Sequence, residues 1–313
     1  ETPRVGWAEQ NTEGWWAAVK LAVAQALYEA KPHNADIRAV SFSGQMHGVV
    51  ALDANRRTLG NAIIWMDQRS VEEREELRQA AGELMTEQLL NQPSSGMMIC
   101  TLLWLRKRKP EVYGQIATVL LPKDYIRFRF TGELNTEPSD ASATLAFSVR
   151  DRGWCRELIG RLGLKSDIWP PVVESCGVAG YLTRSAAEET GLPQGIPVIS
   201  GGGDSFMQML GNNVLGSGTV ACNIGTASQY ATMADGPVFD PLMRCQTWCS
   251  PDPHQWLVQG GTLNGGSALR WFRESVLRTE RPFAELSEEA ALVPAGSEGL
   301  IFIPYLAGER TPF

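Results

Sequence analysis

A single carboxylate follows three glycines, and this is the pattern in the chain that most clearly points to chemistry. The β-branched run at residues 196–199 predicts a strand, which leads through the glycines at 201–203 to Asp204. Glycines let a ligand approach the backbone, and open α/β sheets bind ligands beyond the carboxyl ends of their strands. Asp204 is therefore a candidate base at the mouth of a crevice. The alternative is that it only caps the following turn.

A second strand-like run covers residues 219–224, breaks at Gly225 and Thr226, and resumes at residue 229. A hairpin whose tip carries a glycine and hydroxyl groups can offer amides and small donors to an anion. We expect this cradle and Asp204 to lie on neighbouring strands, which would suit transfer of a phosphoryl group to an alcohol. In the alternative interpretation, Gly225 and Thr226 form a hairpin without a ligand.

Polar and apolar side chains alternate after a buried strand expected at residues 37–42. Gln45, Met46 and His47 stand there between two glycines, a mixture that suits a polyol pocket. A lone histidine is, however, more often structural than ligand-binding. Trp65 and Asp67 end another expected strand at residues 62–65, where the tryptophan could stack on a sugar or belong to the core.

Regular elements alternate along the chain and predict an α/β protein with mixed sheets and a domain boundary near residues 211–218. Ser70 and Glu73 are expected to form a capping box, and Ser267 to cap a later helix. The expected helices cover residues 11–30 (stopped by Pro32 and Asn34), 70–84, 99–113 (with a break at Pro110), a stretch ending at 131–132, and 185–191, and a further strand is expected at 256–258.

Composition excludes several classes of function. The net charge of −7 in 313 residues argues against binding to nucleic acid or to an anionic membrane. No apolar run approaches the roughly 20 residues that span a bilayer, and no signal peptide opens the chain. The six cysteines are scattered and the three histidines far apart, so we expect reduced thiols, a cytoplasmic protein and no metal site built from these residues. No Walker-type phosphate loop is present.

Five segments, taken in order, resemble the FGGY carbohydrate kinases, and among these the pentulose kinases. The resemblance runs from about Trp7 to Phe313, and the ordered set is much more specific than any one of its members. The segments are residues 43–48, 63–69, 121–125, 201–204 and 304–312.

This resemblance implies two actin-like, ribonuclease-H-like ATPase domains of α/β class with a cleft between them. Residues 1–213 would form the sugar-binding domain, and residues 214–313 the start of an incomplete nucleotide-binding domain. The implied reaction is ATP-dependent phosphorylation of a ketopentose, D-xylulose to D-xylulose 5-phosphate, with Mg²⁺. The rivals are a kinase for another ketose or polyol, and a sugar-binding module without kinase activity. The implied partners are the sugar and ATP, and a homodimer is possible.

The resemblance also assigns roles to residues. Asp204 matches the catalytic base, Met46 and His47 fall on sugar-contacting positions, and Gly225 and Thr226 fall on the second phosphate loop. The substrate-binding set expected here is Gln45, Met46, His47, Trp65, Asp67 and Ser205.

Three departures from the family accompany this match. No Asp-x-Gly-Thr phosphate loop precedes Glu1, and the chain stops after the segment at 304–312, so we expect it to be truncated at both ends. Ser205 stands where pentulose kinases commonly carry an asparagine that touches sugar.

Overall fold

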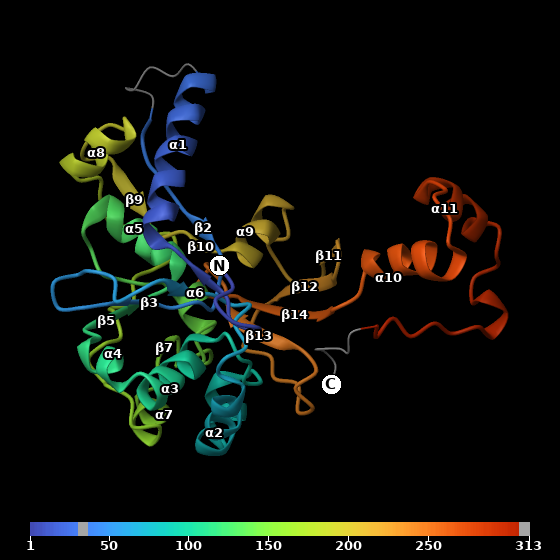
Figure 1. Cartoon of the computed structure of the whole chain (residues 1–313), viewed down its shortest axis with the longest axis horizontal. Helices are drawn as coiled ribbons and strands as arrows, with labels where there is room; N and C mark the ends of the chain where they lie inside the picture. Colours follow the sequence, from blue (N-terminus) through green and yellow to red (C-terminus); the bar gives the residue numbers. More distant parts are fainter. Residues whose placement is uncertain (31–36, 307–313) are drawn as a thin grey trace.

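The computed structural model describes residues 1–30 and 37–306, in which helices and short strands alternate (Figure 1). Figure 1 shows the elements up to α9 gathered together, while strands β11–β14 lead out toward α10 and α11. The predicted mixture of helices and strands is confirmed. Pro32, Asn34 and the residues after Leu306, which include most of the segment at 304–312, lie outside the described residues. In the described part, no helix combines the length and apolar character needed to cross a membrane.

The helices largely follow the sequence pattern. Pro110 separates two helices as predicted, and it does so by opening the second one, where a missing amide hydrogen costs nothing. The helices are α1 Thr12–Ala30, α2 Val71–Ala81, α3 Met98–Arg108, α4 Pro110–Gln115, α5 Pro122–Thr131, α6 Pro138–Ser142, α7 Arg156–Arg161, α8 Arg184–Thr190, α9 Asp204–Gly211, α10 Gly266–Trp271 and α11 Phe283–Ala291, with π-helical turns at Met85–Leu89 and Phe272–Leu277 and a 3₁₀ turn at Ser297–Gly299.

Both predicted helix caps are wrong. Ser70 precedes α2, but its hydroxyl makes no capping hydrogen bond. The carboxylate of Glu73 is buried against α3, 3.6 Å from the ammonium of Lys107, so packing between the helices has taken it away from the cap. Helix α10 begins one residue before Ser267, and the Ser267 hydroxyl instead donates to the carbonyl oxygen of Thr226 (2.7 Å).

Most of the strands are short and pair in twos. The pairs are β1 with β4, β3 with β5, β6 with β7 and β8 with β9, all antiparallel, and β2 with β10, which is parallel. Their bounds are β1 Glu9–Gln10, β2 Ser43–Gly44, β3 Val50–Leu52, β4 Ala62–Ile63, β5 Thr118–Leu120, β6 Phe147–Ser148, β7 Gly153–Trp154, β8 Val178–Tyr181, β9 Pro197–Ile199 and β10 Gly202–Gly203.

The buried strand predicted at residues 37–42 is wrong as a continuous element. Only Val40 makes a bridge there, to Val198, before pairing resumes at β2. Val40 and Phe42 pack on one side against a cluster that includes Trp16 and Phe130. Ser41 between them is exposed, as are Arg38 and Ala39, so the segment is half-covered and not buried on both faces.

The C-terminal part is organised by a four-stranded antiparallel sheet of order β11-β12-β14-β13. Its strands are β11 Val220–Ile224, β12 Ser228–Ala234, β13 Gln246–Cys249 and β14 Trp256–Thr262. The predicted hairpin is confirmed, with Gly225 and Thr226 between β11 and β12. The expectation that Asp204 and this hairpin lie on neighbouring strands is wrong, because β10 pairs with β2 and belongs to a different sheet.

The largest hydrophobic cluster lies around α3, which is buried from Met98 to Leu105. It includes Met46, Phe206 of α9 and Trp248 of β13. Because one core joins the segment after β2, helix α9 and the four-stranded sheet, these three elements hold fixed positions around the cavity described next.

Candidate active site

A cavity of about 490 Å³ brings together five of the residues selected from the sequence. Asp204, Ser205, Met46, His47 and Trp65 all line it. The remaining lining residues are Ser94, Ser95, Gly96, Met97, Gln208, Gln229, Gln246 and Gln259. Trp65 is 42% exposed, which favours its interpretation as a contact residue over that as a core residue.

A second cavity of about 440 Å³ adjoins the first and contains Gly225 and Thr226. The two cavities share Trp65, Gln229, Gln246 and Gln259 as lining residues. The carboxylate and the hairpin are therefore on different sheets but face one continuous region. Asp204 and the Gly225–Thr226 hairpin therefore lie near each other as predicted, although they do not lie on neighbouring strands of one sheet.

Asp204 is the first residue of α9, directly after β10. Its Oδ1 accepts a hydrogen bond from the amide of Ser205 (2.8 Å), but the N-cap of α9 is Gly203, without a side-chain cap, so the structure favours the pocket interpretation over that of Asp204 as a cap. Asp204 stays exposed at the mouth of the cavity, but the cavity walls cover its carboxyl enough to raise its pKa, and the hydrogen bonds from Ser205 oppose this only in part. A carboxylate with a raised pKa is a better proton acceptor near neutral pH.

The glycines before Asp204 serve close packing. Gly201 has φ +77°, and a Cβ built there would lie 2.1 Å from the carbonyl oxygen of Phe42. A Cβ at Gly203 would lie 2.8 Å from Cγ of Met46. The sequence suggested that the glycines admit a ligand, but the structure shows that they admit the neighbouring backbone and the Met46 side chain.

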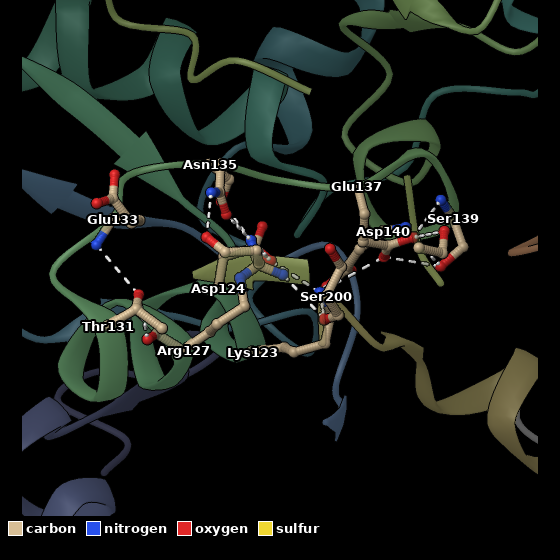
Figure 2. A network of polar contacts seen from close by, with 12 residues as sticks. Lys123, Asp124, Arg127, Thr131, Glu133, Asn135, Glu137, Ser139, Asp140 and Ser200 are labelled. Atoms are coloured by element: carbon tan, nitrogen blue, oxygen red, sulfur yellow. Dashed lines mark hydrogen bonds and ion pairs between the residues drawn. The ribbon is translucent and has the colours of Figure 1, made fainter. Parts of the chain in front are cut away.

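A buried ionic network contacts the backbone at Ser200 and Gly203, just before Asp204 in the chain, and Figure 2 shows its side chains around Ser200. Lys123, Asp124 and Arg127 come from α5, and Glu137 and Asp140 from the segment that opens α6. The Lys123 ammonium lies 2.7 Å from Asp124, 3.5 Å from Glu137 and 3.6 Å from Asp140. Arg127 lies 3.0 Å from Asp124. All five side chains are fully buried.

Charge in this network balances if one acid is neutral. Burial raises the pKa of Asp140 well above its ordinary value, and neither of its oxygens has a hydrogen-bond partner among the described residues. Burial also disfavours the charged form of Asp124, but Lys123 and Arg127 outweigh it and lower that pKa. A protonated Asp140 leaves two cations facing two carboxylates, which is the arrangement that least penalises burial of charge.

The network is hydrogen-bonded to the backbone at both ends of the glycine run. Arg127 donates to the carbonyl oxygen of Ser200 (2.9 Å). The amide of Gly203 donates to the hydroxyl of Ser139 (3.2 Å), which in turn donates to Glu137 (2.8 Å). The residue immediately before Asp204 is thus tied to a buried carboxylate, so the network positions the candidate base.

His47 reaches the cavity through an uncommon backbone conformation, with φ +73°. Its Nδ1 lies 2.8 Å from the carbonyl oxygen of Ala143, and because a carbonyl can only accept, Nδ1 is the donor in this hydrogen bond. The ring also packs edge-on against Trp248 (5.6 Å between centroids). These contacts fix the imidazole and give it a structural role in addition to its place in the cavity wall.

Gln45 and Asp67, both expected to contact the substrate, are not among the residues that line the cavity. The amide of Gln45 donates to Gln10 (2.8 Å). The carboxylate of Asp67 is completely buried, where it accepts from the amide of Ala8 (2.7 Å) and pairs with Arg69 (2.8 Å). The turn after β4 directs Asp67 toward the N-terminal segment and away from the cavity that Trp65 lines, whereas Gln45 remains half-buried beside Gln10.

The hairpin fits a phosphate in part. The amide of Gly225 donates to the carbonyl oxygen of Ala227 (2.8 Å), so it is used within the turn. The carbonyl oxygens of Gly225 and Thr226 accept amides from Gly266 and Gly265 at the start of α10. A Cβ at Gly225 would meet nothing closer than 3.8 Å, which leaves the tip open to a ligand. The Thr226 hydroxyl is the better candidate donor.

The described residues contain no group of three or more histidine, cysteine, aspartate or glutamate side chains arranged to hold a metal ion. Asp204 is the sole carboxylate among the described residues that line the two cavities. Mg²⁺ commonly uses one or two carboxylates together with substrate phosphates and water. The site therefore fits a metal that arrives with a nucleotide better than one resident in the protein.

Several lining residues escaped the sequence analysis. Ser94 and Ser95 precede Gly96 in a loop, and that run of small hydroxyl residues could have marked a ligand-binding turn. Gln246 and Gln259 carry no such local signal, because only the pairing of β13 with β14 brings them to the cavity.

Comparison with known proteins adds independent findings. The model of the N-terminal domain of the FGGY family of carbohydrate kinases matches residues 1–211. The chain is 34% identical over 309 residues to a xylulose kinase of Bacillus subtilis, covering 99% of this chain and 62% of that protein. It therefore spans about three fifths of the length of that relative.

Solved structures agree. A xylulose kinase from Rhodospirillum rubrum superimposes with a TM-score of 0.93 at 29% identity, over 100% of this chain and 64% of that one. A gluconate kinase from Lactobacillus acidophilus gives a TM-score of 0.92 at 27% identity, over 100% and 63% of the two chains. The predicted actin-like fold is thereby confirmed.

Proposed function

Because this chain belongs to the FGGY family of carbohydrate kinases, we propose that the protein containing it transfers the γ-phosphoryl group of MgATP to a terminal hydroxyl of D-xylulose. The observation that carries this proposal is the position of Asp204. It opens α9 at the wall of a cavity lined by Met46 and His47, next to a second cavity that holds the Gly225–Thr226 hairpin.

In this proposal the sugar occupies the first cavity and the phosphates approach through the second. Asp204 holds the attacking hydroxyl and finally accepts its proton. Phosphoryl transfer has a loose transition state, so the carboxylate acts mainly by positioning the acceptor. Its raised pKa keeps it a competent acceptor, and the buried network behind Gly203 keeps it in place.

ATP supplies the phosphoryl group, and Mg²⁺ bound to it neutralises phosphate charge. Thr226 would donate its hydroxyl to a phosphate oxygen from the hairpin tip. The shared wall of the two cavities keeps the acceptor and the phosphate within one region, and closure around them would exclude competing water.

Support for D-xylulose comes from the relatives named xylulose kinase at 31–34% identity. The test is an ADP-release assay on the full-length protein with D-xylulose, D-ribulose, L-ribulose, glycerol and D-gluconate. We expect the highest kcat/KM with D-xylulose. Turnover of another sugar at a higher kcat/KM would reassign the acceptor, and sugar binding without ADP release would favour a binding module.

A further inference from the structure

Three glutamines form a side-chain hydrogen-bonded row across the four-stranded sheet. Gln229 lies on β12, Gln259 on β14 and Gln246 on β13, and the register places Gln246 opposite Gln259. The amide of Gln229 donates to Oε1 of Gln259 (3.4 Å), and the amide of Gln259 donates to Oε1 of Gln246 (3.3 Å). We call these three residues the glutamine row.

The row stands where the two cavities meet. All three glutamines line the cavity that contains Asp204 and also the cavity that contains Gly225 and Thr226. Gln259 in the middle is buried, whereas Gln229 and Gln246 are half-buried. None of the roles assigned above to Asp204, His47 or Thr226 uses these side chains.

The chemistry of the row is neutral and suits hydroxyl groups. Each amide carries two donor hydrogens and an acceptor oxygen, and the bonds within the row use only part of that capacity. Among the described residues that line the first cavity there is no lysine or arginine, and Asp204 is the one acid. A sugar carboxylate in this cavity would be stripped of water beside a like charge and without a cation to pair with it.

We propose that the glutamine row is the element that selects the acceptor, by hydrogen-bonding the hydroxyls of a neutral ketose or polyol and offering no counter-charge to a sugar acid. This inference rests on the proposed kinase function and adds the residues that select its acceptor. It separates this protein from a structural neighbour named gluconate kinase, whose fold is equally similar but whose substrate carries a carboxylate. Specificity arises here through the missing cation as much as through the amides present.

A purely structural role is the competing explanation, since the row also ties three strands together. Its two bonds are at the long end of the normal range, and the backbone pairing of β12, β13 and β14 is complete without them. If the row is only structural, substitutions in it should change the melting temperature and leave the sugar preference unchanged. If the proposal is right, they should change the sugar preference and leave the melting temperature unchanged.

The experiment measures binding and turnover separately in the full-length protein. Gln259→Leu and Gln246→Leu remove the amides, Gln246→Lys places a cation at the cavity wall, and Gln115→Leu on the exposed face of α4 is the control. Calorimetry without nucleotide gives Kd for D-xylulose and D-gluconate, and ADP release gives kcat and KM.

We expect the two leucine variants to weaken D-xylulose binding at least 10-fold and the control to match wild type. Gln246→Lys should raise the preference for D-gluconate relative to D-xylulose at least 10-fold, a gain that misfolding does not produce. Unchanged preference in all three variants, with wild type active on D-xylulose, would overturn this inference alone. Wild type that releases no ADP with any sugar would instead overturn the proposed function.

Discussion

Replacing Lys123 with methionine tests the buried network that positions Asp204. The change removes an ammonium that lies 2.7 Å from Asp124, 3.5 Å from Glu137 and 3.6 Å from Asp140. Glu137 keeps the amides of Ser139 and Asp140 as donors. Asp124 keeps Arg127 at 3.0 Å, so the main loss is one fully buried ion pair.

The expected cost is large. Removing one partner of a buried pair typically lowers the free energy of unfolding by about 3–5 kcal/mol. Since natural domains have only about 5–15 kcal/mol in total, the melting temperature of Lys123→Met should fall by on the order of 10 °C. Lys20→Met is the matched control, because Lys20 pairs with Glu189 at 3.3 Å at a half-exposed site, where such pairs contribute about 1 kcal/mol or less.

The pH dependence separates lost charge from lost packing. In wild type the pKa of Asp124 is lowered, so its contribution is present above the unfolded pKa of about 3.9 and is lost as pH falls through the lower folded value. Without Lys123, burial should raise the folded pKa above the unfolded one. The variant then gains more stability than wild type as pH falls toward about 4, because the raised pKa of Asp140 contributes to both proteins and that of Asp124 only to the variant.

Urea unfolding followed by tryptophan fluorescence at pH 7.5, 6 and 5 measures this difference. We expect the stability gap between wild type and Lys123→Met to narrow steadily on acidification. A gap that is the same at every pH, or a loss no greater than that of Lys20→Met, would refute the charge-balance reasoning.

Three further predictions concern the cavity and the backbone beneath it. His47→Ala should raise KM for the sugar by about 10-fold and KM for ATP by less than about 2-fold, because the imidazole lines only the first cavity; equal effects on both substrates would favour a purely structural histidine. Because burial raises the pKa of Asp204, the acidic limb of the pH profile of kcat/KM for the sugar should have an apparent pKa above the ordinary aspartate value of about 3.9. Activity should be lost as pH falls through this apparent pKa. An apparent pKa at or below about 3.9 would contradict the prediction. Gly201→Ala should lower the free energy of unfolding by at least about 2 kcal/mol, since the new residue combines a positive φ with a clash against the Phe42 carbonyl oxygen. The control is Gly114→Ala, where a Cβ meets nothing within 4 Å, and it should be neutral or stabilising by up to about 1 kcal/mol. Urea titrations measure both changes.

Local patterns were enough to predict the elements and the main candidate. The helical spacing of α1, the break at Pro110 and the turn at Gly225 depend on nearby residues, so the sequence alone predicts them. Asp204 is also marked locally, by the glycines before it. Met46, His47 and Trp65 were predicted as a group, and the structure places them in the same cavity wall.

What sequence could not predict depends on contacts between distant segments. Asp67 follows the end of a strand, as a site residue would, yet its carboxylate accepts a hydrogen bond from the amide of Ala8 in the N-terminal segment. Glu73 forms an ion pair with Lys107 on another helix and does not form the predicted capping box. Gln246 and Gln259 become cavity residues only through strand register, and Lys123 acquires its role only when α5 and α6 meet behind Gly203.

The central claim is that Asp204 accepts the proton of the attacking hydroxyl, and Asp204→Asn tests it most directly. The amide keeps the shape and hydrogen bonding of the carboxylate but cannot take a proton. In the full-length protein, kcat with D-xylulose and MgATP should fall by at least about 10²-fold. The calorimetric Kd for the sugar should change by less than about 3-fold. Turnover near that of wild type, with the same sugar affinity, would contradict the assignment of Asp204 as the base.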